Sequence, residues 1–178
     1  GEKAIFKAVE SAEDDELQGR KDLIHRNLSS IDVVVGIAAS GKTPYVIGAL
    51  KLGNEIDAET IAISCNRDSL IGEIAKHKIE AVVGPEVISG STRMKAGSVT
   101  KMILNMITTT AMIKSGKVYK NLMVDLNVSN QKLKERAISM MKVTTEASED
   151  EIKAALVEAD FDVKTAIVMV KKELDYKR

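Results

Sequence analysis

Ser40-Gly41-Lys42-Thr43 is the segment whose residue types could best do chemistry, because it sets two hydroxyl groups beside a flexible glycine. It follows a short apolar run and is followed at once by Pro44. Thr43 is a favourable helix N-cap, and proline is a favourable first helical residue. The N–H groups and the dipole of a helix N-terminus attract anions. The segment therefore predicts a phosphate-binding loop with Ser40, Gly41 and Thr43 as its contact residues.

Two other interpretations of this loop remain open. Gly36 to Thr43 matches the P-loop pattern G-x-x-x-x-G-K-[ST], and residues 122–125 could supply the aspartate-bearing strand that holds magnesium in nucleotide hydrolases. Against this, residues 37–39 continue the apolar run and leave no room for a wrap around a phosphate. The other interpretation is an ordinary strand-to-helix turn with a capping threonine.

A second polar segment, residues 84–97, combines a carboxylate, hydroxyl groups and two cations. Its candidate substrate-binding residues are Glu86, Ser91, Thr92, Arg93 and Lys95. Ligands of open parallel sheets bind beyond the carboxyl ends of the strands. Both loops are therefore expected to converge on one crevice that suits a polar, anionic small molecule, with an ordinary surface loop as the alternative.

The elements that must position these loops alternate between strand and helix patterns. Unbroken apolar runs predict strands buried on both faces over residues 33–37, 60–65 and 79–83. Helical patterns predict helices over residues 2–15, 22–28, 44–56, 69–75 and 98–114. This alternation predicts an α/β fold, a three-layer parallel-sheet sandwich of flavodoxin-like topology. Three strands are few for such a sheet, so further strands upstream of Gly1, or a partner, are expected to complete it.

The C-terminal part has the pattern of a small helical domain. Helices are expected over residues 129–143, after a capping box that begins at Ser148, and after Asp162, with Leu174 facing inward in the last of them. The predicted domains are residues 1–128 and 129–178. The methionine-rich helix at 98–114 is expected to supply core or subunit contacts.

Composition excludes several classes of function. The 178 residues are 44% hydrophobic and 29% charged, with 26 basic and 26 acidic side chains. This balance and the scarcity of aromatic residues argue against nucleic acid as a partner. No apolar run approaches the ~20 residues needed to span a bilayer. The single cysteine, Cys65, excludes an internal disulfide, fits a reducing cytoplasm, and is expected as a small buried thiol.

Several segments together resemble the N-acetylmuramic acid 6-phosphate etherase family of the sugar-isomerase (SIS) superfamily. They are AVESAEDD, VVVGIAASGKTPYVIGAL, TIAISCN, VGPEVISGSTRMKAGS, KSGKVYKNLMVDL and KTAIVMV. The similarity covers almost the whole chain. Lys42 departs from the family, which usually has arginine there, and makes the P-loop match a coincidence. The resemblance implies a partial SIS phosphosugar-binding domain followed by a helical region similar to ubiquitin-associated folds.

The resemblance also implies an activity. The family cleaves the D-lactyl ether of N-acetylmuramic acid 6-phosphate by syn elimination and water addition, giving N-acetylglucosamine 6-phosphate and D-lactate. This reaction serves cell-wall sugar recycling in the cytoplasm. The enzyme is expected to be a homodimer that needs no cofactor or metal. Glu13 matches the carboxylate that removes the C2 proton, whereas the family's acid lies upstream of Gly1, so the chain alone is expected to be inactive. A non-catalytic phosphosugar-sensing module is the alternative.

Overall fold

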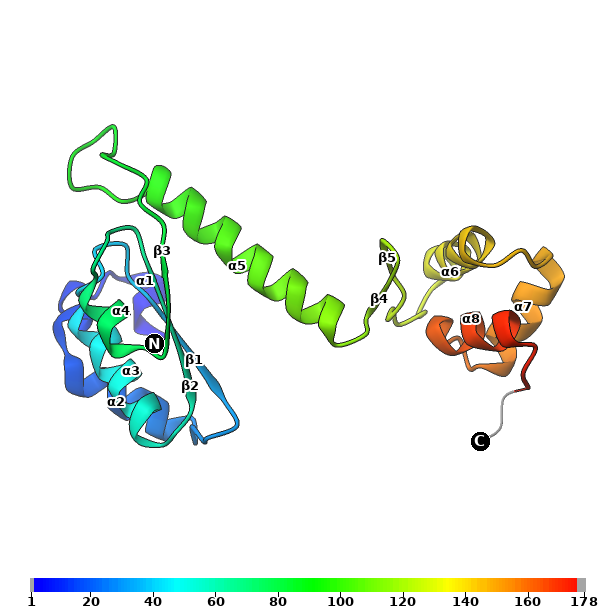
Figure 1. Cartoon of the computed structure of the whole chain (residues 1–178), viewed down its shortest axis with the longest axis horizontal. Helices are drawn as coiled ribbons and strands as arrows, with labels where there is room; N and C mark the ends of the chain where they lie inside the picture. Colours follow the sequence, from blue (N-terminus) through cyan, green and yellow to red (C-terminus); the bar gives the residue numbers. More distant parts are fainter. Residues whose placement is uncertain (1, 176–178) are drawn as a thin grey trace. The chain divides into compact units, whose positions relative to one another are not determined.

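A computed structural model describes residues 2–175 of the chain, which form two compact units, one ending at Asn105 and the other beginning at Met106 (Figure 1). Within these residues no helix is both long and apolar enough to cross a membrane. The predicted domain boundary at residue 128 lies inside the second unit and stays a prediction.

The first unit contains a parallel sheet of three strands in the order β1-β2-β3, with α3 and α4 in the connections. The bounds are β1 Val33–Ile37, α3 Pro44–Glu55, β2 Glu59–Ser64, α4 Leu70–Ile74 and β3 His77–Glu80. The predicted α/β class is thereby confirmed. β3 lies earlier in the chain than predicted, because its pairing with β2 ends where Ser64 lies opposite Glu80.

The core of this unit lies on one face of the sheet. Val34 and Ala62 pack there with Leu50 of α3 and Ile71 of α4. On the other face of β1, Val33, Val35 and Ile37 are 56%, 36% and 40% exposed. The expectation that this strand is buried on both faces is therefore wrong for the described chain. The described helices that contribute to this core pack against the face that carries Val34.

The N-terminal segment is not the single helix expected over residues 2–15. It consists of α1 (Lys3–Phe6), a 3-10 helix η1 (Glu10–Asp14) and α2 (Glu16–His25). The chain is extended at Lys7, and Asp15 caps α2 by accepting a hydrogen bond from the Gln18 amide at 2.8 Å. The acidic run at residues 13–16 thus lies at a helix N-terminus, where the dipole favours negative charge.

α2 packs on α3 at very short range because two glycines lie between the helix backbones. A Cβ at Gly19 would lie 2.1 Å from the Tyr45 carbonyl oxygen, and one at Gly48 would lie 1.9 Å from the Glu16 carbonyl oxygen. The Tyr45 hydroxyl also donates a hydrogen bond to Asp22 at 2.8 Å, which lowers the pKa of Asp22 and raises that of Tyr45. These contacts fix α2, and the η1 segment before it, on α3.

Helix α5 (Lys95–Lys114) follows the first unit's sheet and continues into the second unit. Of its residues only Ala96 and Ile103 are buried. Met102, Met106 and Met112 are 58%, 59% and 47% exposed, so the described chain does not use them as core. Their use as subunit contacts stays a prediction.

The second unit contains a hairpin and three packed helices. The bounds are β4 Val118–Tyr119, β5 Leu122–Met123, α6 Gln131–Thr144, α7 Glu149–Glu158 and α8 Val163–Lys172. The capping box at Ser148 and the Asp162 cap are confirmed. Glu149 contacts Lys142 and Lys153, which lower its pKa to about 2. Leu174 follows the end of α8 and is 56% exposed, so its expected inward position is wrong.

Candidate functional site

The predicted phosphate loop lies between the end of β1 and the start of α3. Gly41 is buried and has a φ of 74°, a conformation that suits glycine. Thr43 occupies the N-cap position, but its side chain makes no capping hydrogen bond. Thr43 therefore has the expected position at the helix start, but its hydroxyl does not make the expected capping hydrogen bond. Because the first N–H groups of a helix have no intrahelical partners, the Thr43 hydroxyl and this helix start can act together on an anion.

The loop is held by hydrogen bonds to the chain after β2. The carbonyl oxygen of Ala39 accepts hydrogen bonds from the Cys65 amide at 3.0 Å and from the Asn66 side chain at 2.9 Å. The Gly41 carbonyl oxygen accepts one from the Ile71 amide at 3.0 Å. Sequence reasoning missed Asn66, although its position directly after a buried strand is a signal for this edge of the sheet. Cys65 is buried, as expected.

The P-loop interpretation is wrong. Gly36 lies within β1, opposite Ala62, and a Cβ at Gly36 would lie 2.7 Å from Val46 Cγ1. Helix packing therefore explains this glycine, because α3 lies directly against it. Asp125 follows β5, which pairs with β4 in a separate sheet, and Asp125 forms an ion pair with Lys117. It does not belong to a strand of the sheet that carries the loop.

The second predicted loop follows β3 and leads into α5. Glu86 accepts hydrogen bonds from the amides of Lys95 and Ala96 at 3.1 and 3.0 Å, which lower the pKa of Glu86. This carboxylate compensates the N-terminus of α5 and explains why the helix begins three residues earlier than expected. Ser91 is half-buried, whereas Thr92, Arg93 and Lys95 are exposed. Substrate contacts by these residues stay a prediction.

Both loops leave the same end of the sheet, because β1 and β3 run parallel to each other (Figure 1). Among the residues that the structure describes, no hydrogen bond or ion pair joins the side chains of residues 40–43 to those of residues 86–95. The parallel sheet thus places the loops at one edge, and their convergence around a ligand stays a prediction.

Glu13 lies in η1, which packs against α3. Its side chain is exposed, and within residues 2–175 it forms no hydrogen bond or ion pair. The element that carries the predicted base is thus fixed to the helix that begins at the phosphate loop. Its catalytic role stays a prediction.

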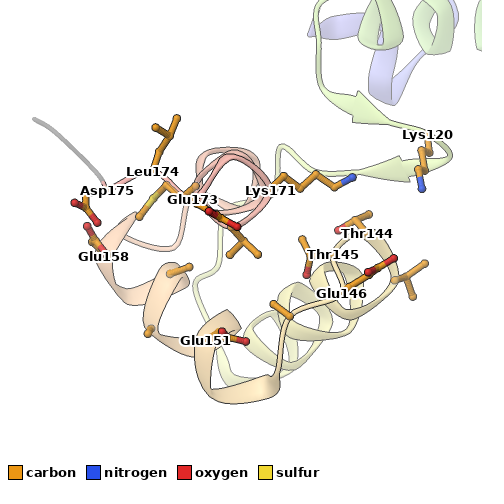
Figure 2. Close-up of a pocket in the computed structure, with 16 residues that line it drawn as sticks. Lys120, Thr144, Thr145, Glu146, Glu151, Glu158, Lys171, Glu173, Leu174 and Asp175 are labelled. Carbon is orange, nitrogen blue, oxygen red and sulfur yellow. The ribbon is translucent and has the colours of Figure 1, made fainter.

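A wide groove of about 860 Å³ lies in the second unit and contains none of the predicted site residues (Figure 2). Its lining includes five carboxylates and two lysines, which are Glu146, Glu151, Glu158, Glu173, Asp175, Lys120 and Lys171. The carboxylates outnumber the lysines, and like charges repel, so this lining disfavours a phosphorylated ligand in spite of the groove's size. In residues 2–175 no group of three or more His, Cys, Asp or Glu side chains could hold a metal ion.

Two protein-family models match separate parts of the chain. Residues 1–54 match the family model described as the glucokinase regulatory protein N-terminal SIS domain. Residues 120–175 match the model described as the C-terminal lid domain of glucokinase regulatory protein.

Curated relatives match across nearly the whole chain. N-acetylmuramic acid 6-phosphate etherase of Bacillus pumilus is 55% identical over 99% of this chain and 58% of the relative. N-acetylmuramic acid 6-phosphate etherase 1 of Bacillus licheniformis is 57% identical over 98% of this chain and 58% of the relative. N-acetylmuramic acid 6-phosphate etherase of Bacillus subtilis is 55% identical over 100% of this chain and 59% of the relative. The chain thus spans less than two thirds of the length of these relatives. Over the part that it spans, the chain is thus similar to proteins named N-acetylmuramic acid 6-phosphate etherase, and its residues 1–54 are similar to an SIS domain.

Proposed function

We propose that the loop from Ser40 to Thr43 binds the phosphate group of a phosphorylated amino sugar. The observation that carries this proposal is the Thr43 hydroxyl, which stands at the start of α3 without capping it. Gly41 adds a tight turn whose carbonyl oxygen is held by the Ile71 amide, so the loop is ordered before a ligand arrives. An ordered loop loses less conformational entropy on binding.

In a protein of the relatives' full length, this site serves as part of a carbon–oxygen lyase. The substrate is N-acetylmuramic acid 6-phosphate, and elimination of its lactyl ether followed by water addition gives N-acetylglucosamine 6-phosphate and D-lactate. Glu13 removes the C2 proton, which requires its carboxylate within ~3 Å of that position. A second carboxylate with a higher pKa protonates the leaving oxygen. The names of the relatives support the assignment of the reaction. The choice of Glu13 rests on the resemblance of the segment AVESAEDD to the etherase family.

Assembly as a cytoplasmic homodimer belongs to the same proposal. The exposed methionines of α5 are apolar side chains that a second subunit could bury. The second predicted loop leads directly into this helix, so burial of α5 against another subunit would also fix that loop.

A non-catalytic phosphosugar sensor is the second candidate. Both matching family models take their descriptions from a regulatory protein, and the Glu13 side chain is exposed. Such a module needs the phosphate loop but not the base. Substitution of Glu13 separates the two functions.

Thermal unfolding of the 178-residue chain tests phosphosugar binding. N-acetylglucosamine 6-phosphate at about 100 times its Kd is expected to stabilise the chain by about 2.7 kcal/mol, because it binds only the folded state. ATP with magnesium is expected to give no shift. Absence of a shift with the phosphosugar at millimolar concentration would contradict the proposal.

Thr43 supplies matched variants for this test. T43A is expected to weaken phosphosugar binding about tenfold, because it removes one hydrogen bond to a charged group. Since the hydroxyl does not cap α3, the melting temperature without ligand should remain close to that of the native chain. T43S retains the hydroxyl and should retain the affinity.

A further inference from the structure

Glu80 is a largely buried carboxylate at the end of β3. Its hydrogen bonds connect it to the turn that packs against the phosphate loop. Its side chain is only 15% exposed. It accepts hydrogen bonds from the Ser69 amide and the Ser69 hydroxyl, both at 2.9 Å, and from the Asp68 amide at 3.2 Å. These bonds lower the pKa of Glu80, so the carboxylate is charged at neutral pH. The charge therefore fixes the turn that precedes α4.

That turn packs directly against the phosphate loop. Ser69 is 5% exposed, and a Cβ placed on Gly41 would lie 2.4 Å from the Ser69 Cβ. Two residues later, the Ile71 amide donates its hydrogen bond to the Gly41 carbonyl oxygen. A shift of Ser69 would thus move its neighbour Gly41 and remove the close contact that defines the loop's shape.

We propose that Glu80 is a positioning residue for the phosphosugar site, acting through Ser69 on Gly41. The inference rests on the proposed binding function of the Ser40–Thr43 loop. Glu80 touches no substrate in this account. It holds the α4 N-terminus, which in turn holds the loop in the conformation that binds phosphate. Glu80 was not among the residues that the sequence indicated, because its strand end and the loop are far apart along the chain.

E80Q in the 178-residue chain tests the inference by isothermal titration with N-acetylglucosamine 6-phosphate. Glutamine has almost the same size, but its amide group cannot accept from both turn amides. The Kd is expected to rise about five- to tenfold, in the range expected for the loss of one hydrogen bond to a charged group. E59Q is the matched control, because Glu59 contacts Lys76 and His77 at the opposite end of the sheet. Its Kd should equal that of the native chain.

Hydrogen exchange separates positioning from a general loss of stability. In E80Q the Ile71 amide, which bonds to Gly41, should exchange about tenfold faster, whereas core amides of β2 such as Ala62 should be unchanged. A uniform change across the first unit would instead indicate a merely structural role and overturn the inference. So would a native Kd in E80Q.

Failure of the proposed function is distinguishable from failure of this inference. If the native chain does not bind the phosphosugar, the proposed function fails, and the role of Glu80 in substrate binding fails with it. The exchange rate of the Ile71 amide in E80Q still reports whether Glu80 holds the loop. If the native chain binds and E80Q binds equally well, only the role of Glu80 is overturned.

Discussion

Replacement of Glu13 by glutamine is expected to lower the turnover of N-acetylmuramic acid 6-phosphate about 10²- to 10⁴-fold in a protein of the relatives' full length. The amide cannot accept the C2 proton, but it has nearly the shape of the carboxylate. Binding of N-acetylglucosamine 6-phosphate should therefore remain within about twofold of the native value. The measurement is D-lactate release at saturating substrate, together with the Kd for the product.

Glu10 offers a matched control on the same 3-10 helix. Like Glu13 it is exposed, and no described residue forms a hydrogen bond or ion pair with its side chain. E10Q changes the charge of the segment by the same amount and should leave turnover near the native rate. Native turnover in E13Q would exclude Glu13 as the base and favour an assignment of this role to another carboxylate. Loss of phosphosugar binding in E13Q would mean that its role is structural.

Alanine at Gly48 is expected to lower the free energy of unfolding by about 2–4 kcal/mol. The new methyl group would lie 1.9 Å from the Glu16 carbonyl oxygen, an atom of the backbone that cannot rotate away. Relief requires α2 to move away from α3, which also disturbs the contact between Tyr45 and Asp22. A Cβ at Gly19 would lie 2.1 Å from the Tyr45 carbonyl oxygen, so G19A should have a similar effect. Urea unfolding of the three chains gives these values.

Gly97 in α5 is the control for the same chemical change. A Cβ there would have as its nearest neighbour the Thr92 carbonyl oxygen at 3.8 Å, an ordinary contact. G97A should change stability by less than about 1 kcal/mol, in the stabilising direction, because alanine favours a helix. Equal stability of G48A and G97A would show that α2 does not lie against α3 at this distance. The position of η1 and Glu13 would then have no support from this packing.

The local elements of the fold could largely be predicted from the sequence. The apolar run at residues 33–37 and the Thr43-Pro44 pair correctly placed β1 and the start of α3. The same is true of the Ser148 capping box, because its two hydrogen bonds lie within four residues. Such features depend on neighbouring residues and need no knowledge of the tertiary structure.

The predictions from sequence were wrong or incomplete where the local structure or burial depends on contacts between segments that are distant in sequence. The helical pattern at residues 2–15 gave way to an extended residue at Lys7 and a cap at Asp15, with no buried residue in α1 or η1. Exposure of Val35 depends on what covers the second face of the sheet, which its own sequence does not specify. Of the candidate site, the Ser40–Thr43 loop was predicted, whereas Asn66 and Glu80 were not. Asn66 follows β2 and bonds to Ala39, and Glu80 ends β3 and bonds to Ser69, so both depend on contacts between segments that are distant in sequence.

A crystal structure of the chain grown with N-acetylglucosamine 6-phosphate would show where the phosphate group binds. We expect the phosphate within about 3 Å of the Thr43 hydroxyl and of the backbone amides between Ser40 and the first turn of α3. A phosphate bound in the groove between α6, α7 and α8, with the Ser40–Thr43 loop unoccupied, would contradict this expectation.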